Sequence, residues 1–256
     1  MPQFETIPAS VTSIKPPVET LYYEGDSTLL AGFKVAIVGS RKASNYSKSM
    51  TYELALALKN AGATVVSGAA MGIDAMAHKG SFPKTIAVMG NSLDMHTPRV
   101  NSGLIASIEK EGLVLSEYPP TTHPTRYSYV DRNRIVVGLS DVVVLAEADL
   151  KSGTMHSARF ALEFGKPIYV FSHRMDESLG TQSLLESGQA EAIVSIKGFI
   201  KAIGLAKTVS AEMDDLLAFC AKHPFYDDTV ALFKEKLFEY ELMGKVRIEN
   251  GRVYPV

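Results

Sequence analysis

Short apolar runs alternate with stretches of helical periodicity along most of the chain. The runs are apolar on both sides, which is typical of strands buried within a parallel sheet. They occupy residues 35–38, 63–66, 85–89, 113–115, 142–145 and 168–171, and helical patterns lie at about 46–61, 72–80, 101–111, 131–139 and 154–165. The alternation predicts an α/β fold, an extended Rossmann-like, doubly wound and mainly parallel sheet with helices on both faces.

The N-terminal residues depart from this pattern. Residues 1–30 contain four prolines and little periodicity. They predict an extended lead-in that packs on the main domain through Leu21, Tyr22 and Tyr23. The Rossmann-like domain then covers residues 31–207.

The pattern changes again after about residue 207. Helical patterns at 213–221 and 230–243 precede alternating residues at 246–254, which surround an Asn-Gly pair. Asn-Gly accepts positive φ at both central turn positions and is a strong hairpin signal. We therefore expect a small winged-helix-like domain over 208–256, joined by a linker near 207–210.

Composition narrows the class of protein. Apolar residues make up 46% and charged residues 21% of the 256 positions, as in ordinary globular proteins. A net charge of −2 gives no whole-molecule attraction to nucleic acid, so any polyanion must meet a local patch. The single cysteine, Cys220, excludes an internal disulfide and is interpreted as a small buried hydrophobe. Without an apolar block near Glu5, or a run long enough to span a membrane, a cytoplasmic location is expected.

A loop with a glycine and two cations follows the first buried strand. It consists of Gly39, Ser40, Arg41 and Lys42, and a helical pattern opens shortly afterwards. Glycine allows a tight turn, and the first N–H groups of a helix lack internal partners and favour negative charge. The stretch therefore predicts an anion site.

The two common nucleotide motifs are absent from the sequence. The loop lacks the three spaced glycines of a dinucleotide site, and the second strand ends in Ser67-Gly68 without the acid that would hold a ribose. Gly165-Lys166 is followed by Pro167, so it is not a P-loop. We therefore expect neither NAD nor ATP, and no cofactor.

Asp74 and His78 lie four residues apart and would share a helix face. A metal pair is conceivable, but two ligands do not make a site, and an intrahelical contact or a local scaffold role is the favoured interpretation.

The densest cationic stretch runs from residue 126 to 134. Three arginines, two tyrosines and an asparagine alternate there with little opposing charge; they are Arg126, Tyr127, Tyr129, Arg132, Asn133 and Arg134. Arginine grips phosphate bidentately and an aromatic ring stacks on any base. The alternative is a loop whose arginines pair with neighbouring acids, or an anchor for the following helix.

A further strand-to-helix turn contains Lys151, Ser152, Gly153 and Thr154. The two hydroxyls can cap the helix, and the free amides there can equally hold a phosphate.

Several stretches in chain order resemble the DprA/Smf DNA-processing family over about residues 20–205. They are residues 37–41, 66–78, 115–118, 132–135 and 151–154. The resemblance implies a single-stranded-DNA-binding protein of natural transformation that shields incoming strands, loads a RecA-type recombinase, forms a homodimer and hydrolyses no nucleotide.

The resemblance also assigns residues. Gly39, Ser40 and Arg41 match the family's phosphate loop, and Arg126 stands where relatives have a DNA-contacting basic residue. The same pocket edge is expected to include Gly68, Arg132, Asn133, Arg134, Lys151, Ser152 and Gly153.

The sequence offers residues for two other functions. A nucleoside-monophosphate glycosidase (phosphoribohydrolase-like) needs a pocket acid, for which Glu117 and Glu163 are the candidates, and no partner base is evident. Duplex binding by the C-terminal domain is disfavoured because residues 205–256 contain seven Lys and Arg but nine Asp and Glu. A protein-contact role is favoured for that domain.

Overall fold

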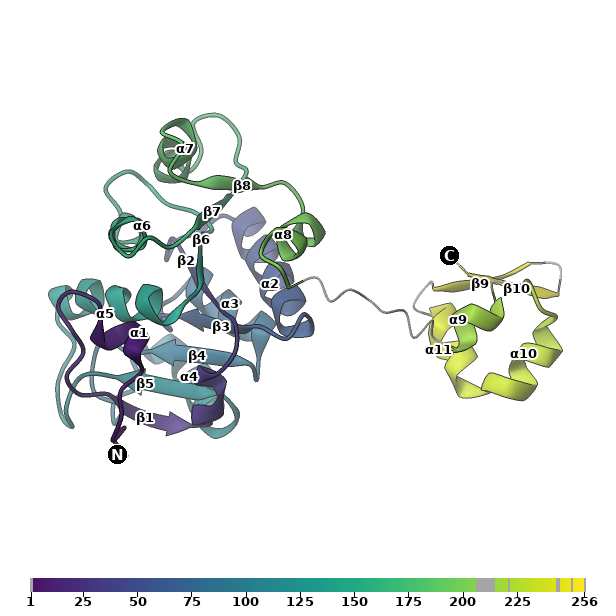
Figure 1. Cartoon of the computed structure of the whole chain (residues 1–256), viewed down its shortest axis with the longest axis horizontal. Coiled ribbons are helices and arrows are strands. Elements are labelled where there is room, and N and C mark those ends of the chain that lie inside the picture. Colours follow the sequence, from purple (N-terminus) through teal and green to yellow (C-terminus); the bar gives the residue numbers. More distant parts are fainter. Residues whose placement is uncertain (1, 206–214, 221, 243–244, 250, 256) are drawn as a thin grey trace. The chain divides into compact units, whose positions relative to one another are not determined.

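The computed structural model describes residues 2–205, 215–220, 222–242, 245–249 and 251–255 (Figure 1). The chain divides into two compact units, Met1–Leu205 and Ala206–Val256. The linker expected near residues 207–210 lies outside the described residues. No helix in the described part of the chain is long and apolar enough to span a bilayer.

The first unit contains an eight-stranded sheet with the order β1-β5-β4-β3-β2-β6-β7-β8. Only β1 runs antiparallel to its neighbour among these strands, so the predicted doubly wound, mainly parallel sheet is confirmed. The strands are β1 (Tyr22–Gly25), β2 (Lys34–Val38), β3 (Thr64–Ser67), β4 (Thr85–Val88), β5 (Leu113–Ser116), β6 (Val142–Leu145), β7 (Ile168–Phe171) and β8 (Glu191–Ile193).

Helices connect the strands of this sheet. They are α1 (Ala9–Thr12), α2 (Asn45–Asn60), α3 (Ile73–Ser81), α4 (Ser102–Glu111), α5 (Arg126–Leu139), α6 (Thr154–Glu163), α7 (Leu179–Glu186) and α8 (Ile196–Ala202), with the 3₁₀ turns η1 (Ser27–Leu30) and η2 (Arg99–Asn101). The sequence pattern did not predict α1, α7, α8, β1 or β8.

Helix α5 begins five residues before its predicted start. Thr125 caps it, because the Ser128 N–H donates to Thr125 Oγ1 (3.0 Å) and the Thr125 N–H donates to Ser128 Oγ (2.9 Å). This reciprocal pair satisfies two backbone donors at the helix start. The arginine- and tyrosine-rich stretch is therefore helical rather than a loop.

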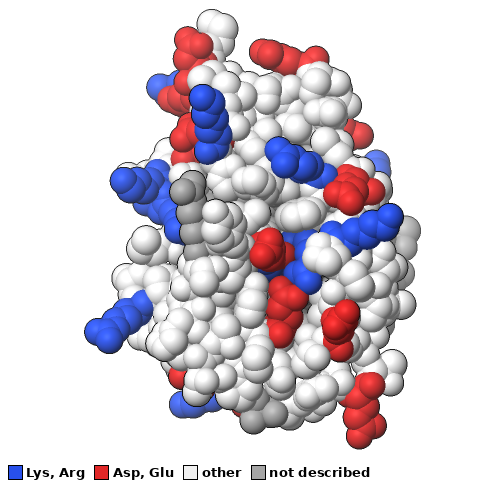
Figure 2. Space-filling view, turned by 90° about the vertical axis from the view of Figure 1, so that its left-hand side faces the viewer, with Lys and Arg blue, Asp and Glu red and all other residues white. Residues whose placement is uncertain are grey.

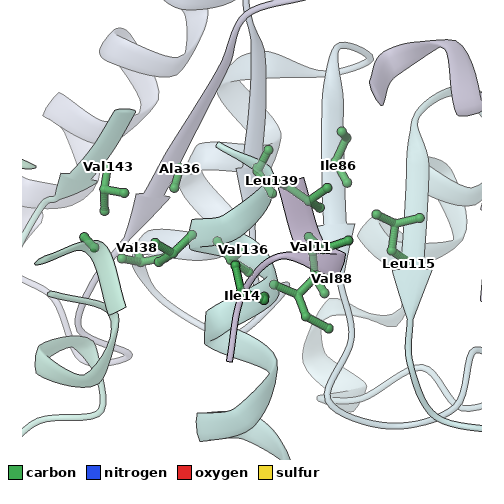
Figure 3. Packing of buried hydrophobic residues seen from close by; sticks show 14 of the residues in the cluster. Val11, Ile14, Ala36, Val38, Ile86, Val88, Leu115, Val136, Leu139 and Val143 are labelled. Atoms are coloured by element: carbon green, nitrogen blue, oxygen red, sulfur yellow. The ribbon is translucent and has the colours of Figure 1, made fainter. Parts of the chain in front are cut away.

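The N-terminal lead-in is less extended than expected. Val11 and Ile14, from α1 and the turn after it, pack against Val136 and Leu139 of α5 (Figure 3). Strand β1 adds to the sheet edge, with Tyr22 opposite Ser116. The lead-in thus covers one face of α5 and holds this helix against the sheet.

The described residues of the second unit form three helices followed by a hairpin. They are α9 (Asp215–Cys220), α10 (Tyr226–Phe233), α11 (Glu235–Leu242), β9 (Val246–Glu249) and β10 (Arg252–Pro255). The predicted helix at 230–243 is interrupted at Lys234, which has a φ of 42°. The hairpin is present, with Glu249 opposite Arg252. Cys220 is fully buried in this unit's core, as interpreted from the sequence.

Candidate functional site

A cleft opens beside the point where the strand order of the sheet reverses. Strands β2 and β6 are neighbours there, and the chain proceeds outward from them in opposite directions. The loops after such strands diverge, which leaves a crevice at their carboxyl ends. The cleft has a volume of about 540 Å³. Of the residues predicted from the sequence, it is lined by Gly39, Ser40, Arg41, Lys42, Arg132, Asn133, Lys151, Ser152 and Gly153.

The start of α2 does not provide the anion site that its position predicted. Ser44 caps the helix by accepting a hydrogen bond from the Ser47 N–H (3.1 Å). The Glu147 carboxylate in turn accepts hydrogen bonds from the Ser44 N–H (3.0 Å) and hydroxyl (2.8 Å). Burial acts to raise the pKa of Glu147, but these bonds and Ser47 hold it below its usual range. A carboxylate from the chain itself therefore occupies this helix end.

The two cations of the loop remain exposed. The guanidinium carbon of Arg41 lies 5.3 Å from the centroid of the Tyr129 ring, within the range of a cation–π contact. Lys42 is exposed at the rim. Neither side chain forms an ion pair within the described residues. Both charges are thus available to a ligand in the cleft.

Glycines at the ends of β3 and β4 make room for two side chains of α5. A Cβ on Gly68 would overlap Nη1 of Arg132, and a Cβ on Gly90 would lie 2.8 Å from Cδ1 of Tyr129. Gly68 itself borders a small side pocket of about 70 Å³ that adjoins Arg41 and Tyr129. Gly68, which we expected at the strand-binding edge of the pocket, does not line the cleft itself and instead packs closely beneath Arg132.

Buried charged residues form the floor of the cleft. Arg132 is 3% exposed and donates a hydrogen bond to the Val88 carbonyl. Burial raises the pKa of the nearby Asp74 carboxyl, although the Arg132 and Arg41 charges oppose the shift. Asp74 also accepts a hydrogen bond from the Ala70 N–H (3.3 Å).

His78 is part of the same buried structure. Burial and the positive charge of Arg132 lower its pKa to about 3, so its ring is neutral at pH 7. Nε2 accepts a hydrogen bond from the Ala69 N–H (3.3 Å), and Nδ1 therefore carries the proton and donates to Thr85 Oγ1 (2.7 Å). No group of three or more His, Cys, Asp or Glu side chains suited to a metal occurs among the described residues. These contacts agree with a scaffold role for Asp74 and His78.

Arg134 is a correction to the expected set of cleft residues. Its guanidinium donates to both carboxylate oxygens of Glu117 (2.8 and 2.7 Å) and to the Pro16 carbonyl (3.0 Å). Only 4% of the Arg134 side chain is exposed. The Arg134 guanidinium therefore links α5 to the lead-in and to the residue after β5. It lies on a different face of α5 from Arg132.

Neither acid considered for a glycosidase is placed to act in the cleft. Glu117 is held by Arg134, as described above. Glu163 is the last residue of α6, whose first residue, Thr154, lines the cleft. Glu163 comes nine positions after Thr154, which is about 14 Å along the axis at 1.5 Å per residue.

The start of α6 faces the cleft. Gly153 is the N-cap residue and supplies no side-chain cap, so the capping role considered for Ser152 and Thr154 is wrong. Lys151 is exposed beside it. Sequence reasoning missed Asp149, His156 and Ser157, which also line the cleft. The only feature of the sequence that could have identified them as cleft residues was their position within one turn of a strand-to-helix junction.

Arg126 is the first residue of α5, three residues before Tyr129. Its side chain lies outside the described residues.

Residues 2–204 match the model of the DNA recombination-mediator protein A family. The chain belongs to this family. Protein Smf of Synechocystis is 36% identical over 219 residues, which is 79% of this chain and 54% of the relative. DNA processing protein DprA of Streptococcus pneumoniae is 36% identical over 66% of this chain and 61% of the relative. The chain therefore spans between half and two thirds of the length of these curated relatives.

Solved structures of family members share the fold of the first unit. DNA processing protein A of Helicobacter pylori, described for its single-stranded DNA binding mode, is 44% identical with a TM-score of 0.77. The alignment covers 79% of this chain and 94% of that chain. DprA of S. pneumoniae is 33% identical with a TM-score of 0.73, over 78% of this chain and 73% of that chain. The family match thus supports membership of the family, and the solved structures support the fold independently.

Proposed function

We propose that this chain binds single-stranded DNA in the cleft between the 39–42 loop, α5 and α6. The observation that carries the proposal is the convergence of three exposed cations, Arg41, Lys42 and Lys151, on one cleft that also contains the Tyr129 ring. Cations of this kind bind phosphates, and an aromatic ring stacks on bases without regard to their identity. The H. pylori relative, described as binding single-stranded DNA, supports it.

A single strand fits these observations better than a duplex. Basic and acidic side chains are interspersed over the face shown in Figure 2, without a broad field of positive charge. A stiff duplex needs an extended basic surface, whereas a flexible strand can bend into one small cleft. The contact is therefore local, in keeping with the net charge of −2.

The action we propose is binding without chemistry. Glu117 is engaged by Arg134, and Glu163 lies at the far end of α6. In the cytoplasm of a naturally competent cell, the bound strand would be shielded and passed to a RecA-type recombinase. Family membership and the family's description as a recombination mediator support this role.

We further propose that the protein acts as a homodimer and that the winged-helix-like second unit contacts protein. The acidic balance of residues 205–256 supports the second statement. Removal of residues 206–256 is then expected to leave single-strand affinity within about twofold. Loss of most binding would instead place the DNA site in the second unit.

The proposed function is tested by fluorescence anisotropy with labelled 20-nucleotide homopolymers and a matched duplex, at two salt concentrations. We expect each single strand to bind more tightly than the duplex, and salt to weaken binding. Equal affinity for duplex and single strand, or affinity that does not change with salt, would contradict the proposal.

A further inference from the structure

Unpartnered polar atoms are concentrated around the cleft. Four buried side-chain polar atoms lack a hydrogen-bond partner within the described part of the chain. Three of them, Arg132 Nε, Ser152 Oγ and Ser157 Oγ, belong to residues that line the cleft. The fourth, Thr51 Oγ1, lies in α2. Buried polar atoms in folded proteins are nearly always paired, so unpaired ones on residues that line a cleft are available to a ligand that enters it.

The chemistry of these three atoms indicates the kind of ligand. The Arg132 guanidinium can only donate, and both serine hydroxyls can donate. The N-terminus of the ten-residue helix α6 opens beside them without a side-chain cap. The helix dipole favours negative charge at such an end. The set suits an anion with several acceptor oxygens, and a phosphate has them.

The depth of the donors distinguishes two forms of phosphate. Ser157 is 0% exposed and Arg132 is 3% exposed, so both belong to the floor of the cleft rather than its rim. A phosphodiester within a strand has two non-bridging oxygens and sugars on both sides, which hold it near a rim. A phosphomonoester has three terminal oxygens and a sugar on one side only, so it can enter with its free oxygens first.

Local charge is compatible with a dianion. Arg132, Lys151 and Arg41 contribute positive charge to the cleft, against the carboxyl groups of Asp74 and Asp149. Burial raises the pKa of Asp74, which reduces the negative charge that it presents. A phosphomonoester carries between one and two negative charges near neutral pH, and more charge than a phosphodiester.

We propose that the floor of the cleft, formed by Arg132, Ser152, Ser157 and the start of α6, binds the terminal phosphate of a single strand. This inference rests on the proposed single-strand function and adds to it a preference for phosphorylated ends. This phosphate site fixes one end of the strand at α6, while the exposed cations at the rim bind the adjoining phosphates. The ligand class is a phosphomonoester, at either the 5′ or the 3′ end.

The test compares one 20-nucleotide oligothymidylate in three forms: unphosphorylated, 5′-phosphorylated and 3′-phosphorylated. Binding to the full chain is measured by competition anisotropy. We expect one phosphorylated form to bind at least about tenfold more tightly than the unphosphorylated form, and phosphatase treatment to abolish the difference. Equal affinity of all three forms would overturn the proposed site for a terminal phosphate and would leave the proposed single-strand function unchanged. Absence of binding by every form would overturn the proposed function itself.

Two variants locate the effect in the cleft. Ser157→Ala and, independently, Ser152→Ala are expected to bring the affinity ratio of phosphorylated to unphosphorylated strand toward one. Thr51→Ala is the matched control, since it removes a buried unpaired hydroxyl that does not line the cleft, and it should keep the ratio. An undiminished ratio in both serine variants would overturn the assignment. The wild-type comparison stands without any variant, so misfolding of one of them does not remove the test.

Titration with small phosphates shows whether the site binds the end of a strand or a free mononucleotide. Thymidine monophosphate and inorganic phosphate are titrated calorimetrically into the full chain. Weak binding of both, with strong binding of a phosphorylated strand, is the expected result. Tight binding of thymidine monophosphate, together with equal affinity of the three strand forms, would overturn the strand-end proposal in favour of a free nucleotide.

Discussion

Replacement of Arg41 by alanine should change the salt dependence of strand binding by a calculable amount. Three cations of the cleft, Arg41, Lys42 and Lys151, are exposed and line it. For single strands, the logarithm of affinity falls with the logarithm of salt concentration by about 0.7 per neutralised phosphate. Three contacts therefore give a slope of about −2, and Arg41→Ala should reduce it to about −1.4.

The same relation predicts the loss of affinity. At 0.1 M salt, one lost phosphate contact lowers affinity about fivefold, or about 1 kcal/mol. Anisotropy titrations at four or more salt concentrations measure both quantities on one preparation.

Arg159→Ala is the matched control for this experiment. Arg159 is an exposed arginine of α6 that does not line the cleft. It should keep the wild-type slope within experimental error. The reasoning is refuted if Arg41→Ala keeps the wild-type slope, or if the two variants change it equally.

Three further predictions concern the scaffold of the cleft. Gly68→Ala should lower the free energy of unfolding by about 1–3 kcal/mol in urea titrations, because the added Cβ overlaps the buried Arg132 guanidinium; the same substitution at Gly103, where nothing lies within 4 Å, should not destabilise the protein. His78 has a folded pKa of about 3, below its unfolded value of about 6.5. Its contribution to stability is therefore complete above pH 6.5 and is lost as pH falls toward 3, by about 1 kcal/mol between pH 7 and 5.5; a His78→Asn variant with the same pH profile as the wild type would contradict this. Arg134→Met should lower the free energy of unfolding by up to about 3 kcal/mol, because it leaves the partly buried Glu117 carboxylate (17% exposed) without its partner. Under folding conditions the variant should keep the wild-type salt slope, and a reduced slope would return Arg134 to the binding surface.

The strands could be predicted where burial on both sides makes an apolar run. All six predicted runs became strands of the sheet, because central parallel strands are covered on both faces. Strand β8 lies at the sheet edge, and its residues Glu191 and Ala192 are exposed. An edge strand of three residues has no periodicity to detect. Helix α5 began early because its start depends on Thr125 and Ser128, which read locally as ordinary loop residues.

The cleft residues likewise include some that could be predicted from the sequence and others that could not. Loop positions after parallel strands could be predicted, because topology brings all carboxyl ends to one edge. The occupation of the α2 end could not, since Glu147 lies 103 positions from Ser44. Arg132 and Arg134 look alike in sequence, yet one helix directs them to different partners, Val88 and Glu117. The sequence alone does not distinguish an arginine that lines the cleft, Arg132, from one that forms a structural ion pair, Arg134, because the difference depends on contacts with distant residues.

Photo-crosslinking tests the central claim most directly. A single strand containing 5-iodo-2′-deoxyuridine is bound to the full chain and irradiated, and the modified residue is identified by mass spectrometry. Because the iodinated base reacts with aromatic side chains stacked on it, we predict an adduct at Tyr129, whose ring lines the cleft. Adducts confined to Tyr226 or Tyr254 of the second unit, with none in the cleft, would contradict the account.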